Sequence, residues 1–63
     1  MSSEDVSIIE AMQKYGGGFA NALAKAAIRS DEDNLRRIKG CWPELWEEYR
    51  MMAAARSKVK EVV

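Results

Sequence analysis

The sequence predicts an all-α fold, a small bundle of three to four short helices that forms one domain over residues 1–63. Apolar residues recur at helical spacing along most of the chain. Glycine and proline interrupt this pattern at the triple glycine 16–18 and again between Gly40 and Pro43. Capping residues and suitably signed charges stand at the ends of the intervening stretches, as expected for helix termini.

The first helix is expected from about Glu4 to Tyr15. Ser2 and Ser3 are suitable N-caps, and the acidic residues that follow suit the start of a helix. An amphipathic stripe is formed by Val6, Ile8, Ile9, Met12 and Tyr15. Gly16 should end the helix in a left-handed turn, where glycine is the usual residue.

The triple glycine, flanked by Tyr15 and Phe19, predicts a hinge whose two aromatic ends are buried. It lacks the lysine and the preceding strand of a phosphate-binding loop, so a tight helix-to-helix turn is favoured. We therefore expect Gly17→Val to damage folding first. Backbone amides at the start of the next helix could still bind an anion, which makes Tyr15 and Gly17 candidate ligand residues.

The second helix is expected over residues 19–28, a stretch of high helix propensity with many alanines. Small side chains let another backbone approach closely, so this helix is predicted to be the central and most buried element. The third helix should begin at Ser30, which with Asp33 approximates a capping box, and end at Gly40. Acidic residues then occupy its first turn and basic residues its last.

The fourth helix should begin near Pro43, which favours the first turn of a helix and makes Trp42 extended. A heavy apolar stripe follows: Trp42, Leu45, Trp46, Tyr49, Met52 and Ala53. The helix should reach at least Ala55, whereas residues 57–63 have no clear stop signal and form a tail that can fray.

Five aromatic residues allow two interpretations that stay open at this point. They form one core joining the first, second and fourth helices, or some are exposed as anchors of an interface, with Trp46 and Tyr49 the candidates. Arg50 and Arg56 would then add positive charge to that surface. Cys41, next to a tryptophan, is expected to be a small buried hydrophobe.

Composition excludes several stabilising devices and functions. Cys41 is the only cysteine and the chain has no histidine, so neither an internal disulfide nor a structural zinc site is possible, and no cofactor is expected. A chain of 63 residues is marginal as a lone monomer. Surplus apolar residues therefore favour a homo-oligomer; they are Met51, Met52, Ala53–Ala55 and the valines of the tail.

Charge and hydropathy limit the kinds of partner that the sequence predicts. Ten basic and ten acidic residues give a net charge of zero, which argues against general nucleic-acid binding. No apolar run reaches transmembrane length, and the acidic N-terminus is unlike a signal peptide. We expect a cytoplasmic protein with no membrane partner. Without histidine, a serine or cysteine nucleophile lacks its commonest base, so an enzyme is the least favoured class and no catalytic residue is assigned.

Residues 23–40 also resemble a helix-turn-helix, which makes a DNA-binding regulator an alternative. Two features count against it. Ile28 stands where the turn usually carries glycine, and the would-be recognition helix begins with Asp31-Glu32-Asp33, which would face phosphates with three negative charges.

A pattern across residues 14–49 resembles short uncharacterised proteins of tailed bacteriophages and prophages. It comprises Tyr15-Gly16-Gly17-Gly18-Phe19 with Ala22-Leu23, then Asp33-Asn34-Leu35 with Lys39, then Trp42-Pro43-Glu44-x-Trp46-x-x-Tyr49. Gly18 departs from the pattern, which often has serine there, and loses a possible N-cap. No site residues can be carried over.

The resemblance implies a viral accessory protein that acts stoichiometrically, by binding a host protein or by sequestering a small anionic ligand such as a nucleotide signal. A minor structural protein of the virion is a further alternative.

Overall fold

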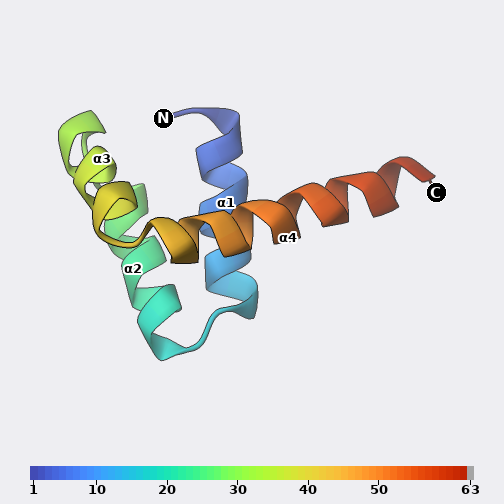
Figure 1. Cartoon of the computed structure of the whole chain (residues 1–63), viewed down its shortest axis with the longest axis horizontal. Coiled ribbons are helices and arrows are strands. Elements are labelled where there is room, and N and C mark those ends of the chain that lie inside the picture. Colours follow the sequence, from blue (N-terminus) through green and yellow to red (C-terminus); the bar gives the residue numbers. More distant parts are fainter. Residues whose placement is uncertain (63) are drawn as a thin grey trace.

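The computed structural model describes the backbone of residues 1–62 and the side chains of residues 1–55. The described backbone forms four helices and no strand: α1 (Ser3–Tyr15), α2 (Gly18–Ile28), α3 (Glu32–Cys41) and α4 (Pro43–Val62) (Figure 1). The predicted all-α class is therefore confirmed, with four helices. The side chains of Arg56 and of the tail 57–63, for which fraying was predicted, lie outside the described side chains. No helix in the described part of the chain is long and apolar enough to cross a membrane.

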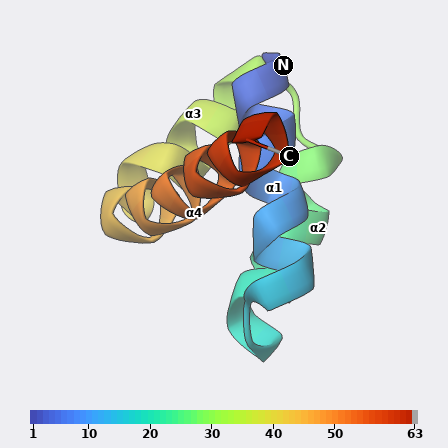
Figure 2. The ribbon, with the colours of Figure 1, turned by 90° about the vertical axis from the view of Figure 1, so that its right-hand side faces the viewer.

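Helix α1 is the central element. It runs antiparallel to α2, and α4 crosses it at a steep angle, so α1 packs against both (Figures 1 and 2). The most deeply buried large side chains, Ile8, Ile9 and Met12, all belong to α1. The prediction that residues 19–28 form the most buried element is thus wrong. The small side chains of α2 let it approach α1, but its larger Phe19 and Ile28 remain exposed.

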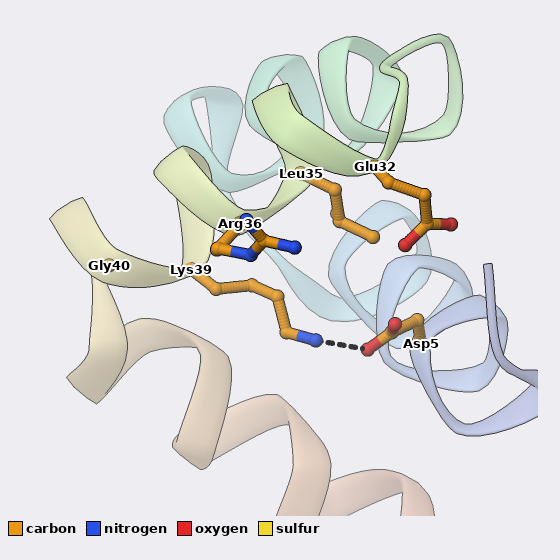
Figure 3. Close-up of a pocket in the computed structure, with 6 residues that line it drawn as sticks. All are labelled: Asp5, Glu32, Leu35, Arg36, Lys39 and Gly40. Carbon is orange, nitrogen blue, oxygen red and sulfur yellow. Dashed lines mark hydrogen bonds and ion pairs between the residues drawn. The ribbon is translucent and has the colours of Figure 1, made fainter.

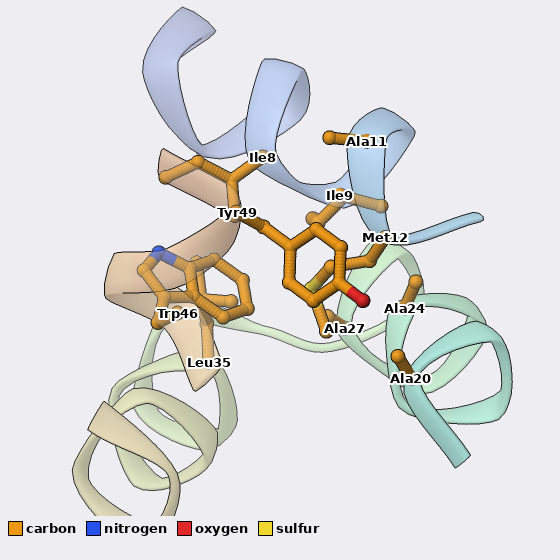
Figure 4. Close-up of a cluster of buried hydrophobic side chains, with 10 residues drawn as sticks. All are labelled: Ile8, Ile9, Ala11, Met12, Ala20, Ala24, Ala27, Leu35, Trp46 and Tyr49. Atoms are coloured by element: carbon orange, nitrogen blue, oxygen red, sulfur yellow. The ribbon is translucent and has the colours of Figure 1, made fainter. Parts of the chain in front are cut away.

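One hydrophobic core joins the four helices (Figure 4). Among the fully buried residues, α2 contributes only alanines, α3 only Leu35, and α4 two aromatic rings, while Leu23 and Ile38 pack against this core partly buried. The ten buried residues are Ile8, Ile9, Ala11, Met12, Ala20, Ala24, Ala27, Leu35, Trp46 and Tyr49. Because α3 brings so little apolar surface, it depends on polar contacts and on its neighbours for its position.

Side chains cap the starts of α1 and α3. Ser2 caps α1 as predicted, since its hydroxyl accepts a hydrogen bond from the Asp5 N–H (3.1 Å). At α3 the cap is Asp31, whose carboxylate accepts from the Asn34 N–H (2.8 Å), and the predicted cap at Ser30 is wrong. The Ser30 hydroxyl instead donates to the Ala27 carbonyl (2.7 Å) at the end of α2.

The boundary between α3 and α4 lies two residues after Gly40. Helix α3 continues through Cys41, and the Trp42 N–H closes it by donating to the Ile38 carbonyl (3.1 Å). Pro43 then begins α4, as its fixed φ and missing N–H favour. Gly40 is helical and does not end α3 as predicted, because Pro43 is the residue that cannot continue it.

Gly16 is the glycine that the fold requires. Its backbone is extended (φ −79°, ψ 156°), so the left-handed turn predicted there is wrong. A Cβ at Gly16 would lie 2.4 Å from the Met12 carbonyl oxygen and 2.5 Å from the Ala20 Cβ. Glycine is therefore needed at position 16 because α1 and α2 approach each other too closely there for a side chain.

The other two glycines of the turn have open surroundings. Gly17 is the N-cap residue of α2 and Gly18 its first helical residue, and a Cβ at either would meet nothing within 4 Å. The sensitivity predicted for Gly17 thus belongs to Gly16, and Gly18 is not the cap position. Tyr15 and Phe19 are exposed rather than buried, because the two helices meet through Gly16 and Ala20 and leave the flanking rings outside.

We predict different effects for alanine at two adjacent glycines. Gly16→Ala should lower the free energy of unfolding by about 1–3 kcal/mol, because the new methyl group overpacks the contact between α1 and α2. Gly17→Ala should change it by less than about 0.5 kcal/mol, since φ −75° suits alanine and the reduced freedom of the unfolded chain offsets the poorer N-cap. Urea denaturation followed by circular dichroism measures both; equal losses would contradict the assignment.

Candidate binding groove

The two aromatic residues expected as surface anchors are in the core. Trp46 and Tyr49 are each 6% exposed and pack against α1 where α4 crosses it (Figure 4). The Tyr49 hydroxyl lies 3.2 Å from the position that a Cβ on Gly16 would occupy. The prediction of these residues as an exposed interface is therefore wrong. They form the apolar face of α4, and this face packs against α1 and holds α4 in place.

The remaining predicted site residues do not form one exposed site with them. Arg50 is exposed and pairs with Glu47 one turn earlier on α4. Tyr15 and Gly17 lie at the turn between α1 and α2, where the Lys14 ammonium group is 5.6 Å from the Tyr15 ring centroid. Of the six residues, only Arg56 falls outside the described side chains.

The exposed aromatic pair consists of Phe19 and Trp42. Their ring centroids are 5.6 Å apart with an interplanar angle of 66°, an edge-to-face arrangement. Phe19 is 59% exposed at the start of α2, and Trp42 is 40% exposed between α3 and α4. The idea of one core containing all the aromatics is therefore wrong for these two rings and for Tyr15, which is also exposed. Trp42 sits four residues before Trp46, but its backbone (φ −130°, ψ 61°) is outside α4, so its ring leaves the apolar stripe.

An open groove runs from Trp42 between α2 and α3; we name it the α2–α3 groove. It has a volume of about 450 Å³, and its lining residues come from the exposed edge of α2, from one face of α3 and from Trp42. These residues are Ala26, Arg29, Ser30, Asn34, Arg37, Ile38, Cys41 and Trp42. Cys41 is exposed there, so its predicted burial is wrong. Cys41 lies about 240° around the helix from Leu35, so it does not share the buried face of α3.

The groove is positively charged. Arg29 and Arg37 have no ion-pair or hydrogen-bond partner for their side chains among residues 1–55. Arg36, the neighbour of Arg37 in sequence, instead points to the other side of α3 and lies 3.7 Å from Asp33. The α2–α3 groove thus combines two unneutralised guanidinium groups with an exposed indole, the residue types that dominate binding hot spots.

A second cavity lies on the opposite side of α3, and its charged groups are already paired (Figure 3). The Lys39 ammonium group donates to the Asp5 carboxylate (3.0 Å) and lies 5.7 Å from the Trp46 ring centroid. Glu32 binds the N-terminal ammonium group (2.9 Å). Since Asp5 is in α1 and Lys39 in α3, this ion pair fastens α3 to the central helix. We assign the cavity a structural role.

Asp5 is the one buried charged residue of the described part. Burial disfavours its charged form, but the hydrogen bond and the positive charge of Lys39, together with hydrogen bonds from Ser2, outweigh the burial. The pKa of Asp5 is therefore lowered below its ordinary value of 3.8. A lowered pKa means that folding favours the ionised carboxylate, so the ion pair stabilises the fold at neutral pH.

No known protein family, curated protein or solved structure matches this chain. Among the described residues, no group of three or more acidic, cysteine or histidine side chains is placed to hold a metal ion. The geometry of the α2–α3 groove is therefore what makes it the candidate site. Sequence reasoning missed the aromatic pair beside this groove because Phe19 and Trp42, 23 positions apart, become neighbours only through the packing of α3 against α2.

We predict that the two tryptophans differ sharply in their importance for stability. Trp46→Ala should cost about 3–5 kcal/mol, because it removes a ring from the core, and should leave so small a domain largely unfolded. Trp42→Ala should cost only about 0.5–1.5 kcal/mol for the lost aromatic pair. Thermal melts of both variants test this, and acrylamide should quench Trp42 more than Trp46. Equal losses of stability would show that Trp42 is also a core residue.

We also predict an acid-sensitive contribution from Asp5. Its stabilisation should be complete above the ordinary pKa of 3.8 and should fall away as the pH drops towards the lowered folded-state pKa. Asp5→Asn should cost about 1–2 kcal/mol at pH 7, a value kept modest because Lys39 is partly exposed. Urea denaturation at a series of pH values is the measurement.

The control for Asp5 is Glu10→Gln, which removes an exposed carboxylate from the same helix. This variant should retain the acid sensitivity of the parent protein. If Asp5→Asn retains it as well, the ion pair with Lys39 is not its source.

Proposed function

We propose that this chain is a small accessory protein of the bacteriophage type that acts by binding a target stoichiometrically rather than by catalysis. The binding surface is the α2–α3 groove with the exposed Phe19–Trp42 pair. The target is an acidic segment of a host protein in the host cytoplasm. The observation that carries this proposal is the pair of unpartnered guanidinium groups, Arg29 and Arg37, beside an exposed indole.

Three physical features support this surface. Its apolar part is built from Ala26, Ile38 and Trp42, so a partner side chain inserted there loses contact with water. The two arginines can each bind a carboxylate through two parallel hydrogen bonds. The groove is also open, which suits the extended surface of a protein segment better than a small ligand that needs enclosure.

A nucleotide is the second candidate for the same groove. Arg29 and Arg37 suit phosphate groups, and the exposed face of Trp42 suits a base. A DNA-binding role would instead use the first turn of α3, where Asp31, Glu32 and Asp33 are all exposed and negatively charged. The helix-turn-helix and virion alternatives have no such supporting contact and stay predictions.

To test this proposal, Asn34 inside the groove is replaced by a photo-crosslinking amino acid, and the variant is produced in the phage-infected host. We expect a specific crosslinked host protein that is absent when the same residue replaces Gln13, which is exposed on α1. Binding of the purified target should fall at least about tenfold in Arg37→Ala and in Trp42→Ala, the size typical of hot-spot residues.

Arg36→Ala is the matched control, because it removes the same charge from the adjacent position on the opposite side of α3. It should bind like the parent protein. A titration with nucleotides, followed by the fluorescence of Trp42, tests whether a nucleotide is the ligand of the groove. If the groove variants bind the target normally, the proposed site is wrong; a response to nucleotides alone would favour the small ligand.

A further inference from the structure

A second groove lies on the far side of Trp42; we name it the α4 groove. It has a volume of about 440 Å³ and is lined by Cys41, Trp42, Pro43, Glu44, Leu45 and Glu48. Cys41 and Trp42 line both grooves, so the two grooves adjoin at these residues. The exposed surface therefore consists of an apolar centre with a groove on either side.

The two grooves carry opposite charges. Arg29 and Arg37 line the α2–α3 groove, whereas Glu44 and Glu48 line the α4 groove. Like the two arginines, Glu44 and Glu48 have no ion-pair partner among residues 1–55. The surface thus runs from two unneutralised positive charges, across Cys41 and Trp42, to two unneutralised negative charges.

We propose that the occupant of this surface is a second copy of the chain, related by a two-fold axis that passes through the Cys41–Trp42 centre. In this dimer each basic α2–α3 groove lies against the acidic α4 groove of the partner. The two aromatic pairs are buried together at the centre. The dimer goes beyond the proposed function and does not depend on it, since either can be wrong while the other holds.

Self-complementarity favours a second copy as the occupant of the two grooves taken together. A two-fold interface needs a surface that matches itself after rotation, and opposite charges on either side of an apolar centre meet that condition. An acidic partner segment would match the basic groove alone and leave Glu44 and Glu48 facing solvent or each other. An apolar centre with a charged rim is also the usual anatomy of an interface.

This surface differs from the one that the sequence suggested for self-association. Met52 and Ala53 pack partly against the core and are not available as a large interface, although Met51 is 62% exposed. The apolar surplus at residues 51–55 is thus smaller than expected. Exposed apolar area is supplied instead by the Phe19–Trp42 pair, at the start of α2 and the junction of α3 with α4.

Charge reversal tests the geometry directly. Analytical ultracentrifugation should show a dimer for the full chain and at least about 100-fold weaker association for R29E/R37E, because acidic groups then face acidic groups. E44K/E48K should be weakened in the same way. Mixing the two variants should restore a heterodimer, since both contacts again join opposite charges.

The matched control is K14E/R36E, which changes the net charge as R29E/R37E does but at exposed residues outside both grooves. It should dimerise like the parent. The two Cys41 thiols should also lie near the axis, so a short bismaleimide should join two copies of the parent but not of R29E/R37E. Circular dichroism verifies that each variant is helical.

Three outcomes would overturn the dimer: a parent chain that stays monomeric at high concentration, dimers that persist in R29E/R37E, or reversed variants that do not associate when mixed. A monomeric parent whose groove still binds a purified acidic target would assign the groove to that target alone. Conversely, a dimer that survives while target binding is absent would overturn the proposed function and leave the dimer standing.

Discussion

The close approach of α1 and α2 at Gly16 is the constraint on which the rest of this structure depends. The Gly16 N–H closes α1 by donating to the Met12 carbonyl (3.0 Å), and the space that a side chain would fill is taken by the Met12 carbonyl oxygen, Ala20 and the Tyr49 hydroxyl. One missing methyl group therefore allows contacts among three helices. Asn21 adds to the same junction, since its side-chain amide donates to the Gln13 carbonyl (3.0 Å) near the end of α1.

This constraint explains why the aromatic residues of α4 are buried in the core. Because Tyr49 fills the space above Gly16 and Trp46 packs one turn earlier, the apolar face of α4 is used up inside the molecule. Helix α3 has Leu35 as its one fully buried core residue, with Ile38 packed partly against the core, and is fastened to α1 by the ion pair between Lys39 and Asp5. Its other face, from Asn34 to Cys41, is then left to line the α2–α3 groove. The exposed groove is a consequence of how little of α3 the core requires.

Sequence patterns were sufficient for the local features of the fold. Capping residues, glycine and proline placed the four helices to within a few residues, and apolar spacing identified Ile8, Ile9 and Met12 as core residues. These features are set by interactions within one or two helical turns. The errors concern distant contacts, because spacing gives the face of a helix that is apolar and not the neighbour that covers it.

The aromatic residues show this limit most clearly. Trp42 and Trp46 share a helical spacing of four, yet one is exposed and the other buried. Their difference arises at the break between α3 and α4, where the backbone of Trp42 leaves the helix. Likewise, three successive glycines look equivalent in sequence, and only the position of Ala20 and Tyr49 singles out Gly16. The candidate site could not be found from the sequence because it is built across such distant contacts.

The two proposed uses of the α2–α3 groove compete, and the competition has a direct consequence. A second copy seated on Arg29 and Arg37 covers the groove, so a target that binds there must first separate the dimer. Apparent affinity for the target then falls as the concentration of the chain rises, because only the open form is competent to bind. At low concentration the monomer exposes Trp42 and both arginines for a target, whereas accumulation of the chain hides them. If both proposals hold, the dimer of this 63-residue chain keeps the apolar surface covered, and the charges around that surface determine how readily the two copies separate.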